Sequence, residues 1–165
     1  MLNFLEGLSQ SDLIRLVAES DYGYPAVLTA HAIGMALVVG IVLVFDLRVL
    51  GLAKRIPLSV LRRFFTVAWI GFAINLTSGT LLFLANYTAF IKNVAFITKI
   101  SLLLIAALCT WLLARDIESN RLPAAAQGAI ETPTSRARMI AALSVILWLG
   151  AITAGRIVGY TDVPE

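Results

Sequence analysis

AVLTAHAIGMALVVGIVLVF, residues 26–45, is the first long apolar run of this chain, and Asp46-Leu47-Arg48 closes it. At about 1.5 Å per residue, a helix of this length covers roughly 30 Å, which is the thickness of the hydrocarbon core of a bilayer. His31, the only histidine of the chain, lies near one end of the stretch. The stretch therefore predicts a transmembrane helix with a polar side chain inside it.

The composition of the whole chain agrees with a membrane protein. Of its 165 residues, 59% are hydrophobic and 14% are charged, and the mean hydropathy is +0.89. A soluble domain of this size needs more polar surface. The net charge of +3 comes from basic residues between the apolar runs, so we expect contact with lipid and no nucleic-acid partner.

Three more apolar runs follow the first, and each is long enough to span a bilayer. The four predicted spans cover about residues 26–45, 66–85, 94–113 and 139–158. Short links between spans favour an antiparallel bundle, so the fold class is all-α. We expect residues 1–24 to form an amphipathic N-terminal segment, with one helix over residues 2–19 along the interface, and residues 25–165 to form the four-helix transmembrane domain.

The basic residues predict the orientation. Five follow the first span and four follow the third, whereas the N-terminal segment and the loop after the second span hold one each. Loops rich in Lys and Arg stay in the cytoplasm. We therefore expect a multi-pass protein of a bacterial inner membrane with both termini outside. The nine loop residues are Arg48, Lys54, Arg55, Arg62, Arg63, Arg115, Arg121, Arg136 and Arg138.

In this orientation, three basic side chains from three helices share the outer leaflet: His31, Lys99 and Arg156. Ionisable groups inside a membrane are costly and indicate function. Asn75 on the second span and Tyr160, which follows Arg156 by four residues, complete the candidate ligand site. The alternative is structural: Lys99 and Arg156 extend to the head groups, while His31 and Asn75 join helices.

A metal or haem site is a second possibility. His31 and Met35 are four residues apart on one helix, so both can contact one soft ion such as Cu(I). Haem ligation by two histidines requires a second copy of the chain, because the chain has one histidine. No acid and serine accompany His31 in a hydrolase pattern, so we expect no catalytic residues and no enzyme activity of the chain alone.

At the other end of the first span, Asp46 and Arg48 predict a structural charge clamp. The carboxylate of Asp46 can pair with Arg62, Arg63 or Arg115 of neighbouring helices at the cytoplasmic interface. Such pairs contribute little to stability where water reaches them. We therefore expect these residues to serve topology and packing.

The segments His31-Ala-Ile-Gly34, Gly40, Phe45-Asp46-Leu47-Arg48-Val-Leu-Gly51, Gly79-Thr-Leu-Leu-Phe83 and Ala95-Phe96-Ile-Thr-Lys99 resemble a group of uncharacterised small bacterial inner-membrane proteins. That group is similar to the copper-resistance D-like membrane domain. The resemblance covers roughly residues 26–115. It implies a helical membrane protein in which His31, Asp46, Arg48 and Lys99 matter. It does not imply copper transport, because the several histidines and methionines of a copper conduit are absent.

These observations favour an accessory or redox-associated membrane subunit that binds a quinone-like or lipid ligand in the outer leaflet. His31 would donate to a quinone carbonyl, and Lys99 and Arg156 would stabilise the head group. One alternative is a copper- or haem-binding protein that uses His31. The other is a purely structural subunit, associated with other membrane subunits or with copies of itself.

Overall fold

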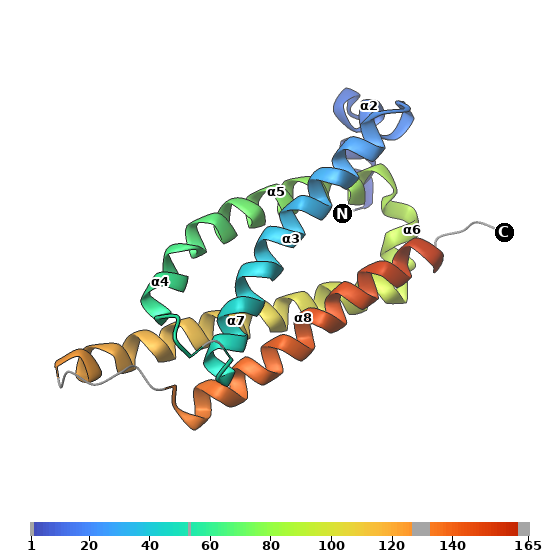
Figure 1. The fold of residues 1–165 in the computed structure, drawn as a ribbon. Helices are drawn as coiled ribbons and strands as arrows, with labels where there is room; N and C mark the ends of the chain where they lie inside the picture. The colour runs from blue at the N-terminus through green and yellow to red at the C-terminus, as the bar shows by residue number, and fades with distance from the viewer. Residues whose placement is uncertain (1, 53, 127–132, 162–165) are drawn as a thin grey trace.

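The computed structural model describes residues 2–52, 54–126 and 133–161, and all regular secondary structure in these ranges is helical. The helices are α1 (Leu2–Ser9), α2 (Asp12–Glu19), α3 (Gly23–Leu50), α4 (Leu58–Arg63), α5 (Phe65–Ala85), α6 (Tyr87–Lys92), α7 (Val94–Ala126) and α8 (Ser135–Thr161). Four of them, α3, α5, α7 and α8, are long and apolar enough to span a membrane. The predicted all-α fold with four spans is confirmed, and the protein is a multi-pass membrane protein with four candidate spans (Figure 1).

The helix ends differ from the prediction in two places. The N-terminal segment is two short helices, α1 and α2, rather than one helix over residues 2–19. The third span continues through the polar residues 115–126, which the sequence assigned to a loop, so that part of the prediction was wrong. Residues 115–122 contain no glycine or proline, and nothing local stops the helix there.

Three other helix ends follow local sequence signals. Pro25 lies in the first turn of α3, where its missing N–H costs nothing. Gly51 ends that helix with a left-handed φ of 106°, and its N–H bonds to the carbonyl of Arg48. Asn93, a residue type favoured at helix N-termini, caps α7, because its Oδ1 accepts from the N–H of Phe96 at 3.0 Å.

The long helices form two antiparallel pairs, α3 with α5 and α7 with α8, and the pairs meet mainly where α3 contacts α8. At one end of the bundle, which we call the basic end, α3, α4, α7 and α8 enclose a core. The pairs diverge toward the opposite end, which we call the α6 end (Figure 1). The core at the basic end contains Phe45, Val49, Leu58, Leu61, Leu113, Ile117, Ala137 and Ala141.

Aromatic rings connect the pairs at the α6 end. Phe90 of α6 stacks on Phe96 of α7 with a centroid distance of 5.1 Å, and Phe83 of α5 stacks on Phe96 at 5.6 Å. Helix α2 packs against α3 and α5 through its buried residues Ile14 and Val17. The diverging pairs are therefore held together at both ends.

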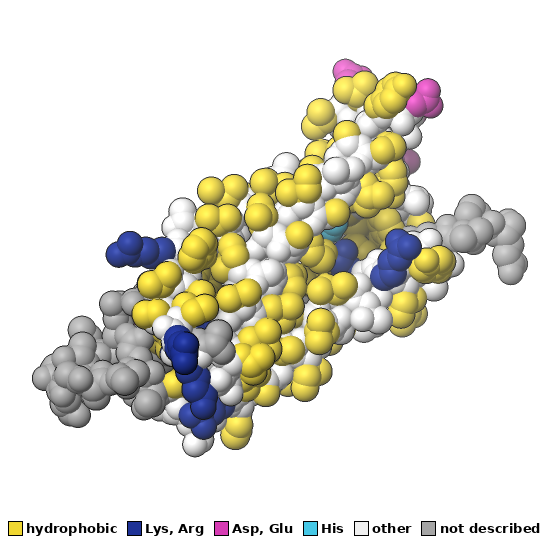
Figure 2. Space-filling model, in the orientation of Figure 1, with side chains coloured by type: hydrophobic (Ala, Val, Ile, Leu, Met, Phe, Trp, Pro, Cys, Tyr) yellow, Lys and Arg dark blue, Asp and Glu magenta, His cyan; other side chains and the backbone are white. Residues whose placement is uncertain are grey.

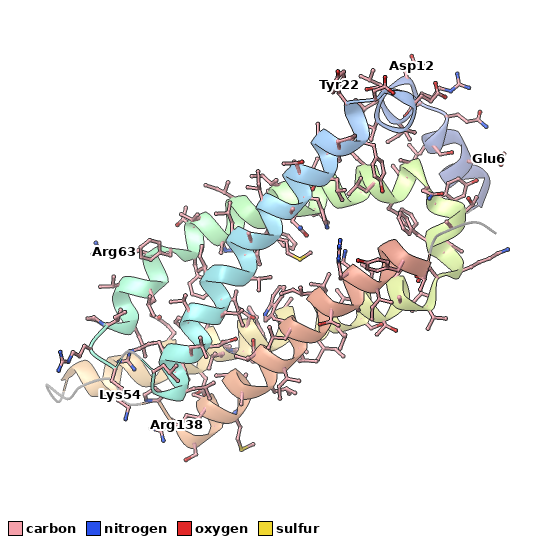
Figure 3. The ribbon with its side chains drawn as sticks, turned by 45° about the vertical axis from the view of Figure 1, so that its right-hand side comes forward. Glu6, Asp12, Tyr22, Lys54, Arg63 and Arg138 are labelled. Atoms are coloured by element: carbon pink, nitrogen blue, oxygen red, sulfur yellow. The ribbon has the colours of Figure 1, made fainter. Side chains whose placement is uncertain are left out.

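Charge divides between the two ends of the bundle. Figure 3 shows Lys54, Arg63 and Arg138 at the basic end, and Glu6, Asp12 and Tyr22 at the α6 end. Between the ends, many large apolar side chains on all four long helices are exposed, including Leu28, Leu76, Leu104 and Ile146. An apolar surface of this extent fits contact with lipid.

Candidate ligand site between the helix pairs

Two glycines bring α3 and α5 into backbone contact. A Cβ atom on Gly34 would lie 2.7 Å from the backbone nitrogen of Asn75 and 2.8 Å from the carbonyl oxygen of Gly71. Neither distance leaves room for a methyl group. This close approach lets polar side chains near Gly34 bond directly from one helix to the other.

His31 uses this contact to bond across to α5. Its Nδ1 lies 3.1 Å from the carbonyl oxygen of Asn75 and 3.2 Å from Oγ of Ser78. In return, the side-chain amide of Asn75 donates to the carbonyl oxygen of His31 at 3.0 Å. Gly79 makes room for the ring, because a Cβ there would lie 3.0 Å from Cε1 of His31. The imidazole is therefore fixed in position by α5.

The shorter contacts assign the proton of the neutral imidazole to Nδ1. The backbone carbonyl oxygen of Asn75, at 3.1 Å, only accepts, so this contact requires an N–H on Nδ1. The side-chain amide nitrogen of Asn75 lies further from Nδ1, at 3.3 Å, and donates to the carbonyl oxygen of His31 at 3.0 Å instead. The hydroxyl of Ser78 donates to the carbonyl oxygen of Ile74 at 2.6 Å, which leaves its oxygen free to accept as well. Hydrogen positions are assigned here from the network. Nε2 then carries a lone pair, and it has no hydrogen-bond partner among the described residues.

Lys99 reaches toward this ring from the other helix pair. Its stem lies on Gly155 of α8, where a Cβ would be 3.2 Å from Cδ and 3.5 Å from Nζ of Lys99. The half-buried ammonium is close enough to His31 to interact with it electrostatically. It has no hydrogen bond or ion pair within the described ranges. Figure 2 shows the histidine in a hollow on this face, with Lys or Arg side chains beside it.

Arg156 and Tyr160 form a separate pair on α8. Nη2 of Arg156 donates to the Tyr160 hydroxyl at 3.1 Å, and the guanidinium carbon lies 5.2 Å from the ring centroid. Both side chains are exposed. Of the predicted ligand residues, the structure therefore gathers His31, Asn75 and Lys99, and it holds Arg156 and Tyr160 in a contact of their own. Ser78 is not among the predicted ligand residues. Its spacing of three residues from Asn75 places it on the same helix face, and this spacing is the sequence signal that identifies it.

The residues of the alternative metal site have different surroundings. His31 bonds to α5, whereas Met35 packs against an apolar cluster of Val39, Val42, Ala106 and Trp148. In the described part of the chain, no group of three or more His, Cys, Asp or Glu side chains is arranged to hold a metal ion.

Asp46 and Arg48 are placed differently from the predicted charge clamp. The Asp46 side chain is fully buried, and neither carboxyl oxygen has a hydrogen-bond partner within the described part of the chain. Nε of Arg48 donates instead to the carbonyl oxygen of Ile56 at 2.6 Å, so Arg48 ties the end of α3 to the following connection. Among the residues that the structure describes, no ion pair joins Asp46 to an arginine.

Comparison of the chain with known protein families, curated proteins and solved structures finds no significant match. The functional argument therefore depends on the geometry of the site.

Proposed function

We propose that this protein is a small membrane subunit that binds the head group of a quinone-like amphiphile in the hollow beside His31 and Lys99. The observation that carries the proposal is the ammonium of Lys99, which is half-buried without a carboxylate or hydrogen-bond partner in the described structure. A charge in this setting is costly unless a ligand or water solvates it. The unpartnered Nε2 of His31 lies on the facing helix pair.

The two side chains offer complementary chemistry. The Lys99 ammonium donates hydrogen bonds and attracts negative charge, so it suits a carbonyl oxygen or the oxyanion of a reduced ring. The Nε2 lone pair of His31 accepts, so it suits a hydroxyl. The network around Nδ1 thus favours His31 as an acceptor from a quinol hydroxyl, rather than as the donor to a quinone carbonyl that the sequence alone suggests.

The position of the hollow suits an amphiphile. It lies between two helix pairs whose outer surfaces are apolar, so an isoprenoid or acyl tail can lie against the helices while the head stays near the charges. Arg156 and Tyr160, close to the end of α8, are available to a lipid head group nearer the interface. The basic end carries most Lys and Arg, which favours the cytoplasmic side for that end and the outer leaflet of a bacterial inner membrane for the hollow.

The proposed role is that of an accessory subunit of redox membrane complexes. The described site provides binding groups but no nucleophile paired with a base, so the chemistry belongs to a partner enzyme. A purely structural subunit and a copper or haem protein are the competing outcomes of the following test.

The test measures which molecules remain bound after gentle purification in lipid nanodiscs. Wild type, Lys99→Met and the matched control Lys92→Met are extracted, and quinones and phospholipids are quantified by mass spectrometry. We expect wild type and Lys92→Met to retain quinone, because Lys92 is exposed on α6. We expect Lys99→Met to bind it about tenfold more weakly, equivalent to about 1.4 kcal/mol.

Each other outcome overturns the proposal. A wild-type sample without quinone argues for a structural subunit, and equal retention in Lys99→Met places the ligand elsewhere. Stoichiometric copper or a haem absorption spectrum in the same sample would favour the metal alternative. Phospholipid held in a Lys99-dependent manner would replace the quinone by a lipid.

A further inference from the structure

A second polar site lies inside the bundle, toward the basic end. Asp46 of α3 and Ser144 of α8 are both fully buried, and all three of their side-chain oxygens lack a hydrogen-bond partner. The hydroxyl and the carboxyl are close enough to interact. In the described part of the chain, these are the only buried side-chain polar atoms left without a partner. Because all of these atoms lie at one contact of α3 with α8, a single explanation should account for their missing hydrogen bonds.

The charged and titratable groups around Asp46 do not neutralise it. On α7, the buried thiol of Cys109 is within electrostatic range, and Arg115 is exposed and lies over the Trp111 ring at 5.4 Å. On α3 itself, Arg48 is bonded to the carbonyl oxygen of Ile56. On α4 and α8, the described basic residues Arg63, Arg136 and Arg138 are exposed.

Among the described residues, an ionised Asp46 carboxylate has no cation bonded to it and no exposed surface through which to reach bulk water. Phe45, next to Asp46 in the chain, and Val49 on the following turn belong to the buried apolar core of this end. Moving a lone carboxylate into such a medium costs so much free energy that the group takes up a proton instead. A neutral acid also resolves the missing hydrogen bonds, because its O–H donates and its carbonyl oxygen accepts.

We infer that Asp46 and Ser144 form a buried proton-binding site, in which Asp46 is a neutral carboxylic acid that shares a hydrogen bond with the Ser144 hydroxyl. The ligand is a proton taken from water, and the step is the association of that proton with one carboxylate oxygen. The site is independent of the proposed quinone site. It lies about 22 Å further along the axis of α3 than His31. On α3, Val39 and Val42 lie between His31 and Asp46, and they form an apolar cluster with Ala106 and Trp148.

Infrared spectroscopy of the full-length protein in lipid bilayers tests this inference at neutral pH. We expect the carbonyl stretching band of a protonated carboxylic acid, with a small shift to lower frequency in heavy water. The band disappears in Asp46→Asn, which keeps the shape of the side chain, and stays in the control Asp12→Asn, since Asp12 is exposed. Absence of the band in wild type, or its persistence in Asp46→Asn, overturns the inference.

A second variant keeps the test decisive if Asp46→Asn does not fold. Ser144→Ala retains the acid and removes its partner, so the band persists and moves to higher frequency because the hydrogen bond is lost. An unchanged band in Ser144→Ala would show that the serine is not part of the site. Loss of the band in Ser144→Ala would show that the acid there is ionised, which also contradicts the proposed pair.

Discussion

At the α6 end of the bundle, His31 lies beside a hollow and its ring is bonded across two helices, whereas toward the basic end Asp46 lies in a closed interior without a partner. Both residues belong to α3. The helix pairs diverge around His31, and Lys99 approaches it from the other pair. Around Asp46 the same pairs converge, and apolar side chains fill the space.

This difference separates two ways of keeping a polar group inside a membrane. In the half of the bundle around His31, which we call the open half, α5 binds Nδ1 of the imidazole, and Nε2 and the Lys99 ammonium stay without a partner in the described structure. In the half around Asp46, which we call the closed half, a proton alone is enough to neutralise the carboxyl. The half around His31 has space for the proposed amphiphile, whereas the half around Asp46 has space only for the proposed proton.

The first prediction concerns the closed half and has the largest expected effect. Phe45→Ala removes a ring that is 1% exposed and that meets Phe65 edge-on at 5.2 Å. We expect the free energy of unfolding to fall by about 3 kcal/mol, at the low end for buried aromatics, because lipid or detergent solvates the ring in the unfolded protein. Thermal unfolding in detergent micelles measures it. The control Val44→Ala changes a neighbouring side chain that is 51% exposed, and an equal loss there would mean that the core does not stabilise this end.

The second prediction concerns the close contact of α3 with α5 at Gly34, which positions His31. Gly34→Ala forces a methyl group against the backbone of α5. We expect the free energy of unfolding to fall by about 1–3 kcal/mol and quinone retention to weaken. Gly40→Ala is the matched control on the same helix, because nothing lies within 4 Å of a Cβ there. If both variants unfold at the same temperature, the close contact of α3 with α5 is not a source of stability.

The third prediction tests how His31 is held. Ser78→Ala removes one of the groups bonded to Nδ1. We expect the free energy of unfolding to fall by only about 0.6 kcal/mol, since the carbonyl oxygen of Asn75 still accepts from Nδ1. The control Thr80→Ala removes a hydroxyl that bonds only within α5. Nitrogen NMR of the histidine ring reads out the tautomer, and a proton on Nε2 in the wild type would contradict the assignment.

The smallest effect is expected at Arg156. Its guanidinium is exposed and already bonded to Tyr160, so Arg156→Gln should change stability by less than about 0.5 kcal/mol. Quinone retention should fall by less than in Lys99→Met. A larger fall in Arg156→Gln would place the head group nearer the interface than the hollow beside His31.

Much of this architecture follows from one-dimensional patterns. Apolar runs of about twenty residues indicate the four spans, and local signals such as Asn93 before α7 mark a helix end correctly. The pattern fails at residues 115–126, because a polar helix has the composition of a loop. Side-chain partners are harder to predict. Asp46 at the end of the first span suggests an ion pair with Arg62, Arg63 or Arg115, yet among the described residues its buried carboxyl has no such partner. The rotation of a helix determines which residues are buried, and the sequence does not show this rotation in a span that is apolar on every face.

Proximity across helices is predicted only in part. The sequence places His31 and Lys99 at a similar depth, and the structure brings them close enough to interact. It places Arg156 there too, but whether a long side chain turns toward the hollow or along its own helix depends on a neighbour such as Tyr160. Composition also does not show which glycines contact a functional side chain. Gly155 is one of them, because the aliphatic stem of Lys99 packs directly against it.

Asn93, described above as the cap of α7, also donates from Nδ2 to the Thr161 hydroxyl at 2.9 Å. One side chain thus ties the first turn of α7 to the last turn of α8. A slip of one helical turn between them would move Lys99 by about 5.4 Å and take it off Gly155. Asn93 therefore helps to keep the two helices in register. The position of Lys99 relative to α8 thus depends in part on an amide at the helix end, outside the hollow itself.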